Sequence, residues 1–187
     1  MKNLIIAATL VVTAASTASA QLYKSVDKSV NVSFFSETPM ENIDAKSSAS
    51  TSIINFGTDS VIIKIPVKAF VFKNSLMGEH FNENYMESEK YPYSIFRGKI
   101  DTKFDLTKNG TYKVKALGRA TIHGVTNPCT LEGTFTVKDG ELTLVSSMDV
   151  NLAEYKVEIP SLVKDKIAKV IKVKVDANYL PYVAKKK

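Results

Sequence analysis

The residues best suited to chemistry cluster around one of the two histidines. Glu79, His80 and Glu83 would lie close together on a helix, because residues three and four positions apart share a face. Such a group could bind a metal ion or exchange protons with a substrate. A solvated helix face ordinarily carries the same residue types, and the chain has only 2 His with which to complete a site. We therefore predict no catalytic residue, no metal site and no enzymatic activity.

Two further residues with reactive side chains, His123 and Cys129, have structural interpretations. His123 ends a predicted strand and precedes a glycine, which predicts a hydrogen-bonded histidine beside a tight turn. Cys129 is the chain's 1 Cys, so neither an intramolecular disulfide nor a multi-cysteine metal site can form. We predict a partly buried thiol at the start of a strand. The chain has no nucleophile elbow, phosphate loop, dinucleotide fingerprint or HExxH motif.

The composition is that of one folded domain. The 187 residues include 44% hydrophobic and 24% charged side chains, which excludes a disordered chain. Lysine and arginine outnumber aspartate and glutamate by 25 to 19. The lysines are spread over the exteriors of the predicted strands, and no basic–aromatic motif occurs. We therefore predict no nucleic-acid partner.

Residues 1–20 have the three-part pattern of a secretory signal peptide. Lys2 precedes an apolar stretch over 4–12, and Ala18-Ser19-Ala20 forms a cleavage site of the A-x-A type. The apolar stretch is shorter than the ~20 residues of a membrane-spanning helix, and no later segment is long and apolar enough to be one. We predict a mature protein of residues 21–187 that is periplasmic or secreted and has no transmembrane anchor.

The elements that must position these side chains are mostly strands. Apolar residues alternate with lysines or other polar residues along much of the chain, which is the pattern of strands with one buried face. The dipeptides Asn109-Gly110 and Asp139-Gly140 predict type I′ hairpins, because both accept positive φ. About eight strands with one apolar face suit a sandwich or a closed barrel. The predicted strands span 30–36, 43–54, 61–69, 94–104, 112–122, 129–137, 142–150 and 171–179.

Two segments break the alternation and predict short helices. Residues 75–86 place large apolar side chains at helical spacing, and residues 160–168 begin with a proline at a plausible first helical position. An eight-stranded barrel is wide enough to hold one small or elongated ligand. A helix across its mouth would close such a cavity and exclude water from an apolar guest. We therefore predict an all-β fold: a single antiparallel eight-stranded lipocalin-like barrel capped by one or two short helices.

Four stretches give the chain a resemblance to a known family. They are residues 60–72, the segment 79–98, the GRATIHGVT sequence at 118–126, and the closing segment 150–177. Together they resemble the YceI-like family of bacterial exported proteins, over Tyr23 to Tyr179. The resemblance implies a lipocalin-like barrel that encloses long isoprenoid chains such as polyprenyl diphosphates or quinones. It brings no catalytic residue to this chain.

The leading hypothesis is a periplasmic binding or carrier protein for an isoprenoid or another long-chain amphiphilic lipid, with 1–20 as the signal peptide and 21–187 as the YceI-like barrel domain. It implies no cofactor, since the polyisoprenoid or quinone would be the ligand. A homodimer and a transient contact with a membrane surface both stay open. Strand parity and helix spacing select the predicted ligand-binding residues, which are Phe34, Phe70, Phe72, Leu76, Met77, Phe81, Phe96, Ile122, Phe135, Leu144 and Met148.

Two other classes of function remain as alternatives. In the first, the barrel is filled by its own side chains, and the protein acts in interactions or a stress response without a lipid ligand. In the second, the protein is an enzyme that acts on lipids, for which only Glu79, His80 and His123 are available. Ala120, where the family has a larger aliphatic residue, and the pair Tyr85-Met86 depart from the family pattern at predicted pocket positions.

Overall fold

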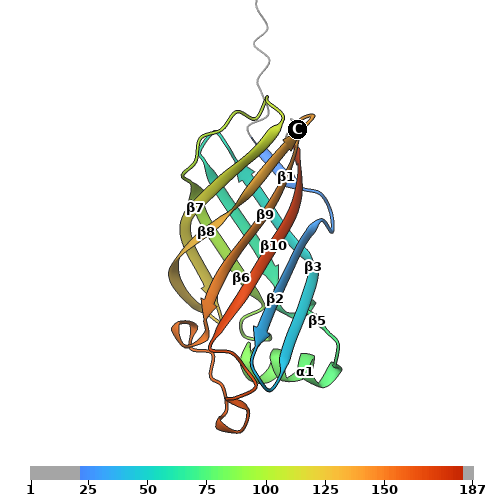
Figure 1. Cartoon of the computed structure of the whole chain (residues 1–187), viewed down its shortest axis with the longest axis vertical. Helices are drawn as coiled ribbons and strands as arrows, with labels where there is room; N and C mark the ends of the chain where they lie inside the picture. Colours follow the sequence, from blue (N-terminus) through green and yellow to red (C-terminus); the bar gives the residue numbers. More distant parts are fainter. Residues whose placement is uncertain (1–21, 183–187) are drawn as a thin grey trace, which may run out of the picture.

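The structure is a computed structural model that describes residues 22–182, so the predicted signal peptide lies outside the described residues. Its strands are antiparallel and form one continuous sheet, rolled into an elongated barrel (Figure 1). The strands are β1 (Leu22–Ser25), β2 (Val30–Glu37), β3 (Asn42–Asn55), β4 (Ser60–Pro66), β5 (Val71–Phe72), β6 (Tyr93–Ile100), β7 (Gly110–Ile122), β8 (Val125–Lys138), β9 (Glu141–Asn151) and β10 (Val170–Pro181).

The sheet closes because β10 pairs with β9 on one side and with β2 on the other. β1 pairs with the same two neighbours as β2, namely β3 and β10, so these two strands share one place in the barrel. β5 adds only a two-residue pairing to β3. The closed path therefore has eight strand positions, in the order β2-β3-β4-β6-β7-β8-β9-β10. This confirms the predicted eight-stranded antiparallel barrel.

Alternation along the strands places the apolar side chains inside the barrel. In β10, Ile171, Val175 and Tyr179 are buried, whereas the lysines at 172 and 174 are exposed. Because successive side chains of a strand point to opposite faces, one face of each strand contributes to a shared interior. The inward apolar face predicted from the sequence is confirmed.

One of the two predicted hairpin turns is correct and the other is wrong. Asp139 and Gly140, with φ of 52° and 85°, join β8 to β9. Asn109 instead ends the loop 101–109, and Gly110 begins β7. The Asn109 side chain accepts a hydrogen bond from the Asp139 backbone N–H at 2.8 Å and donates one to Asp139 Oδ1 at 3.0 Å. The Asn109 side chain therefore joins the loop 101–109 to the turn between β8 and β9, and it does not form a two-residue hairpin turn.

The first predicted helix is confirmed and the second is shortened. Helix α1 (Ser75–His80) continues as the π-helical segment η2 (Phe81–Tyr85), and Asn74 caps it by accepting a hydrogen bond from the Leu76 N–H at 2.9 Å. Within 160–168 only the 3₁₀ turn η4 (Ser161–Val163) forms; the other 3₁₀ turns are η1 (Val67–Ala69) and η3 (Leu152–Tyr155).

The segment 160–168 forms only a short turn because it is brief and because its end is held by a strand instead of continuing a helix. Nine residues are too few for a helix to form without packing support. The chain instead anchors to β2, since the Ala168 N–H donates to Ser36 Oγ at 2.9 Å. We refer to residues 160–169 as the 160s loop.

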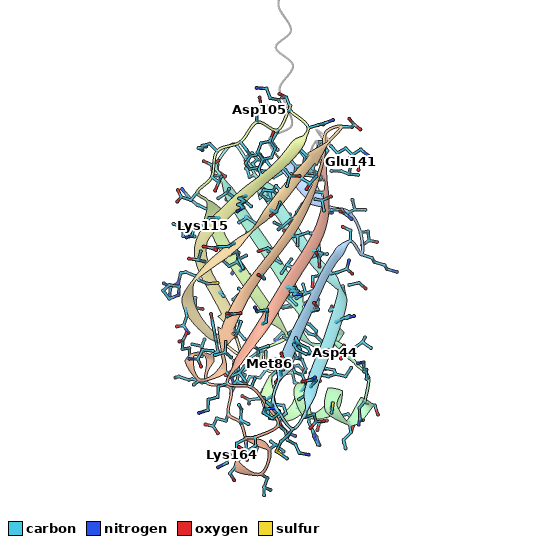
Figure 2. The ribbon with its side chains drawn as sticks, viewed as in Figure 1. Asp44, Met86, Asp105, Lys115, Glu141 and Lys164 are labelled. Atoms are coloured by element: carbon cyan, nitrogen blue, oxygen red, sulfur yellow. The ribbon has the colours of Figure 1, made fainter. Side chains whose placement is uncertain are left out.

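The two ends of the barrel differ in how they are filled. At the end that carries Asp105 and Glu141 (Figure 2), aromatic rings from several strands and loops pack together. Phe104 stacks on Tyr112 with ring centroids 5.2 Å apart and also packs against Phe56 and Phe135 at 5.6 Å and 5.4 Å. Helix α1 and the 160s loop lie at the opposite end (Figure 1). We call these the filled end and the helix end.

Candidate functional site

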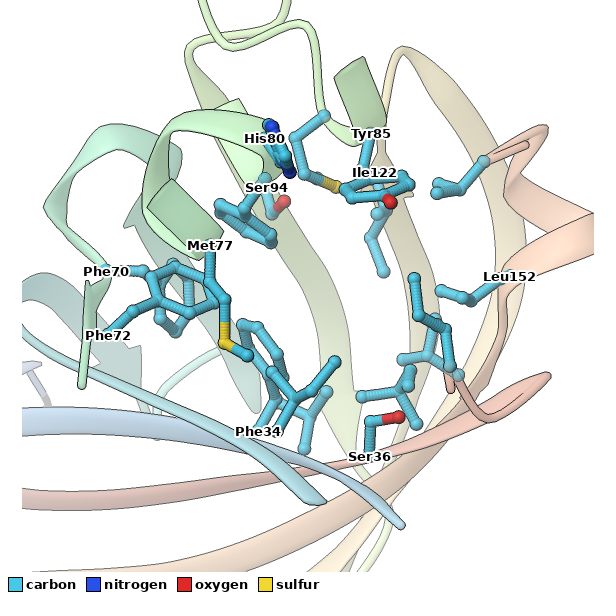
Figure 3. Close-up of a pocket in the computed structure, with 18 of the residues that line it drawn as sticks. Phe34, Ser36, Phe70, Phe72, Met77, His80, Tyr85, Ser94, Ile122 and Leu152 are labelled. Atoms are coloured by element: carbon cyan, nitrogen blue, oxygen red, sulfur yellow. The ribbon is translucent and has the colours of Figure 1, made fainter. Parts of the chain in front are cut away.

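A cavity of about 390 Å³ occupies the helix end of the barrel. Its walls come from the inner faces of strands that include β2, β6, β7 and β10, and its cover comes from α1, η2 and the 160s loop (Figure 3). The lining is mostly aliphatic and aromatic. A volume of a few hundred Å³ with such a lining is typical of small-molecule sites. The arrangement can hold an apolar guest away from water.

A cluster of four phenylalanines attaches the helical cover to the barrel. The Phe81 ring, from η2, lies 5.4 Å from Phe34, 5.7 Å from Phe70 and 5.0 Å from Phe72, measured between centroids. Aromatic pairs at this spacing add about 0.5–1.5 kcal/mol each beyond the area they bury. The phenylalanine cluster therefore closes one side of the cavity.

Most of the residues predicted to bind the ligand line this one cavity. Nine of the eleven do so: Phe34, Phe70, Phe72, Leu76, Met77, Phe81, Phe96, Ile122 and Met148. Phe135 and Leu144 point into the barrel but lie toward the filled end, where they line a separate cavity of about 20 Å³. Strand parity places all of these strand residues inside, but it does not give their height along the barrel axis.

The cavity also has lining residues that the sequence reasoning missed. Some had a usable signal: Val32 and Val150 share strand parity with Phe34 and Met148, and Val173 lies on the predicted inward face of its strand. The residues between η3 and β10 were not selected. The predicted helix over 160–168 contained three of them, but only the fold brings this irregular segment over the mouth. That second group comprises Val157, Ile159, Val163, Lys166 and Ile167.

The polar residues singled out in the sequence do not come together as a catalytic or metal-binding group. Of Glu79, His80 and Glu83, only His80 lines the cavity, and its side chain is exposed. Within residues 22–182, no three His, Cys, Asp or Glu side chains are arranged to hold a metal ion. Cys129 is partly buried as predicted; burial raises the pKa of its thiol, and its Sγ lies 3.8 Å from Met148 Sδ.

His123 holds the segment that follows η2 against the barrel. With Gly124 it forms the positive-φ turn between β7 and β8, with φ of 50° and 73°. Its Nε2 lies 2.8 Å from Glu87 Oε2 and its Nδ1 lies 3.3 Å from the Tyr155 carbonyl oxygen. Its ring meets Tyr91 edge-on at 4.9 Å. The prediction of a hydrogen-bonded structural histidine beside a tight turn is confirmed.

Replacing Glu87 by Gln is expected to remove a part of the stability that depends on pH. The hydrogen bond from His123 lowers the pKa of Glu87 below its ordinary value of 4.5. Because the pKa of Glu87 is lower in the folded protein than in the unfolded chain, its ionised form stabilises the fold at pH values above the unfolded-chain pKa. This contribution is lost as the pH falls through the folded-state pKa. Denaturant unfolding between pH 3 and pH 7 should show wild type more stable than E87Q at pH 7, with the gap closing toward pH 3.

The matched control is Glu83→Gln, which neutralises an exposed carboxylate on η2. E83Q should track wild type across the whole pH range. A deficit in E87Q that is equal at pH 3 and pH 7 would contradict the assignment, because it would come from packing rather than from ionisation.

The model of the YceI-like domain family matches residues 10–179 of the chain. The chain belongs to the YceI-like family. No curated protein matches this YceI-like sequence. Among the helices that the structure describes, none is long and apolar enough to cross a membrane.

Solved structures share the YceI-like fold at low sequence identity. One is a polyisoprenoid binding domain from Saccharophagus degradans implicated in plant cell wall breakdown, which is 12% identical, with a TM-score of 0.73 over 86% of this chain and 98% of that one. Another is BcnA from Burkholderia cenocepacia, which is 15% identical, with a TM-score of 0.69 over 80% of this chain and 95% of that one. At these identities the likeness shows a common fold.

Proposed function

We propose that this YceI-like protein is an exported binding or carrier protein that holds the chain of an isoprenoid or another long amphiphile in its cavity. The observation that carries the proposal is the apolar cavity of about 390 Å³ at the helix end. At the opposite end, aromatic side chains of the barrel pack against each other, whereas at the helix end the phenylalanine cluster closes one side of the cavity and leaves it open inside. The description of the Saccharophagus degradans structure as a polyisoprenoid binding domain supports the choice of ligand class.

The energetics of such binding would be mainly hydrophobic. Each methylene moved from water into the cavity contributes about 0.8 kcal/mol. Ordering a long chain and losing its translational freedom oppose this gain. A preformed cavity with few polar side chains lowers the cost, since little polar surface has to lose water. Binding without catalysis is the activity that this lining supports best.

Native mass spectrometry of protein purified from its host without detergent tests the proposal. The expected result is an adduct of apolar, prenyl-like mass that solvent extraction releases. The protein component should have the mass of residues 21–187, which tests the proposed export. A protein with no adduct that also takes up no added prenyl lipid would overturn the binding function and favour a protein that acts through partners.

Replacing Met77 by Asp is expected to weaken lipid retention by about tenfold or more, because a carboxylate in an apolar cavity must lose water without a partner. Met77 lies on α1 and lines the cavity beside the phenylalanine cluster (Figure 3). Asn84→Asp is the control, since it adds the same charge at an exposed position of η2. Retention is measured as the bound fraction in native mass spectra. Equal retention by the two variants would count against α1 as a cover of the site.

A further inference from the structure

The charged side chains of the cavity neutralise each other. Among the described lining residues, the carboxylate of Glu41 and the ammonium group of Lys166 are the fully charged groups. They form an ion pair across the mouth, with 3.9 Å between Glu41 Oε2 and Lys166 Nζ. The pair joins the turn between β2 and β3 to the 160s loop. The single lysine that a bound anion could meet in the cavity therefore already has a carboxylate partner.

The charges around the mouth do not favour an anion either. The three segments that surround it, 37–46, 68–90 and 152–169, contain ten carboxylates and eight lysines, so this end is slightly acidic although the whole chain carries a net charge of +6. Several of these lysines have carboxylate partners of their own, as in Lys73–Asp44 at 3.0 Å and Lys90–Glu87 at 3.6 Å. Diphosphate recognition ordinarily uses uncompensated arginine or lysine side chains.

One side of the cavity carries side chains that suit an uncharged oxygen. Figure 3 shows His80, Tyr85 and Ser94 together on the side away from Phe34 and Ser36. All three line the cavity, and His80 reaches its exposed edge. A phenol, a hydroxyl and an imidazole can each donate or accept one hydrogen bond without a formal charge. We call these three residues the polar corner.

We infer that the ligand has an uncharged head group with a carbonyl or hydroxyl oxygen, as in a quinone or an alcohol, and not a diphosphate. The head group lies at the polar corner, and the chain extends over the phenylalanine cluster into the barrel. This inference rests on the proposed binding function and adds to it the chemical class of the ligand.

The test compares two ligands with the same prenyl chain, the free alcohol and the diphosphate. Binding is measured at pH 8, above the range in which histidine side chains ordinarily titrate. The alcohol is expected to bind about tenfold or more tightly than the diphosphate, because the diphosphate would lose water without gaining a free cation. Equal or tighter binding of the diphosphate overturns the inference and leaves the binding function intact. Binding of neither ligand overturns the binding function itself.

Two sets of variants separate the head-group effects from general damage. Glu41→Gln frees Lys166, so the ratio of diphosphate affinity to alcohol affinity should rise several-fold. Asp165→Asn, an exposed neighbour outside the cavity lining, should leave this ratio unchanged. Tyr85→Phe should weaken the alcohol about three- to tenfold, which is the range for one hydrogen bond, and leave the corresponding prenyl hydrocarbon unaffected. Equal weakening of alcohol and hydrocarbon would show that Tyr85 only packs, and would overturn its role at the head group.

Discussion

Replacing Ala120 by Phe is expected to weaken lipid binding by about tenfold or more while the barrel stays folded. Ala120 lies on β7, is only 3% exposed and lines the cavity next to its register partner Phe96 on β6. A benzyl group at this position would enter the cavity and occupy space that the ligand needs. The empty volume beside it limits the cost to the protein, which we expect within the range of about 1–3 kcal/mol for added bulk in a core.

The matched control for this variant is Leu117→Phe on the same strand. Leu117 points to the outside of the barrel and is 48% exposed, so a larger side chain there leaves the cavity unchanged. Titration with a prenyl alcohol should show A120F weaker by about tenfold or more and L117F equal to wild type. Full uptake by a folded A120F would mean that the ligand lies elsewhere.

Replacing Gly118 by Ala is expected to lower the free energy of unfolding more than any other substitution proposed for this protein. Gly118 on β7 is the register partner of Gly98 on β6. A Cβ on Gly118 would lie 2.5 Å from the Gly98 Cα and closer still to the carbonyl oxygen of Arg97. Both obstacles are backbone atoms, so the strands themselves would have to separate. We expect a loss of about 3 kcal/mol, which lowers Tm by about 6–12 °C in a domain of this size.

Gly78→Ala is the control for Gly118→Ala, because it adds the same methyl group at a position with more space. In α1 a Cβ on Gly78 meets only the Phe72 ring, at an ordinary contact distance of 3.4 Å. Alanine is also favoured over glycine in a helix by about 1 kcal/mol. Thermal unfolding should therefore place G78A at or above wild type and G118A well below it. A Tm for G118A within a few degrees of wild type would mean that the pairing of β6 and β7 adapts easily at this point.

The cover of the cavity is attached to the barrel at both of its ends. The phenylalanine cluster packs Phe81 against β2 and β5, and the hydrogen bond between Glu87 and His123 fixes the segment that follows η2. The cavity is partly open to solvent, and the 160s loop lies beside its mouth. The Glu41–Lys166 ion pair joins the 160s loop to the turn between β2 and β3. It therefore bears on how a ligand enters the cavity as well as on the choice of head group.

Much of the fold could be predicted because alternation is a local property of the backbone. Residues such as Val175 and Tyr179 must face inward if Lys174 faces outward, whatever the rest of the chain does. The same local reasoning found the helical segment over 75–86 and the Asp139-Gly140 turn. These features depend on spacings of a few residues, which the sequence displays directly.

Only the tertiary structure decided where the site lies within the barrel. Leu144 and Met148 share one face of β9, yet only Met148 lines the large cavity. The 160s loop covers the mouth because Ala168 hydrogen-bonds to Ser36, 132 positions earlier in the chain. The sequence by itself determined which side chains point inward, since that follows from the period of each strand. The stagger between strands that are distant in sequence determined the height of each side chain, and no local pattern contains that stagger.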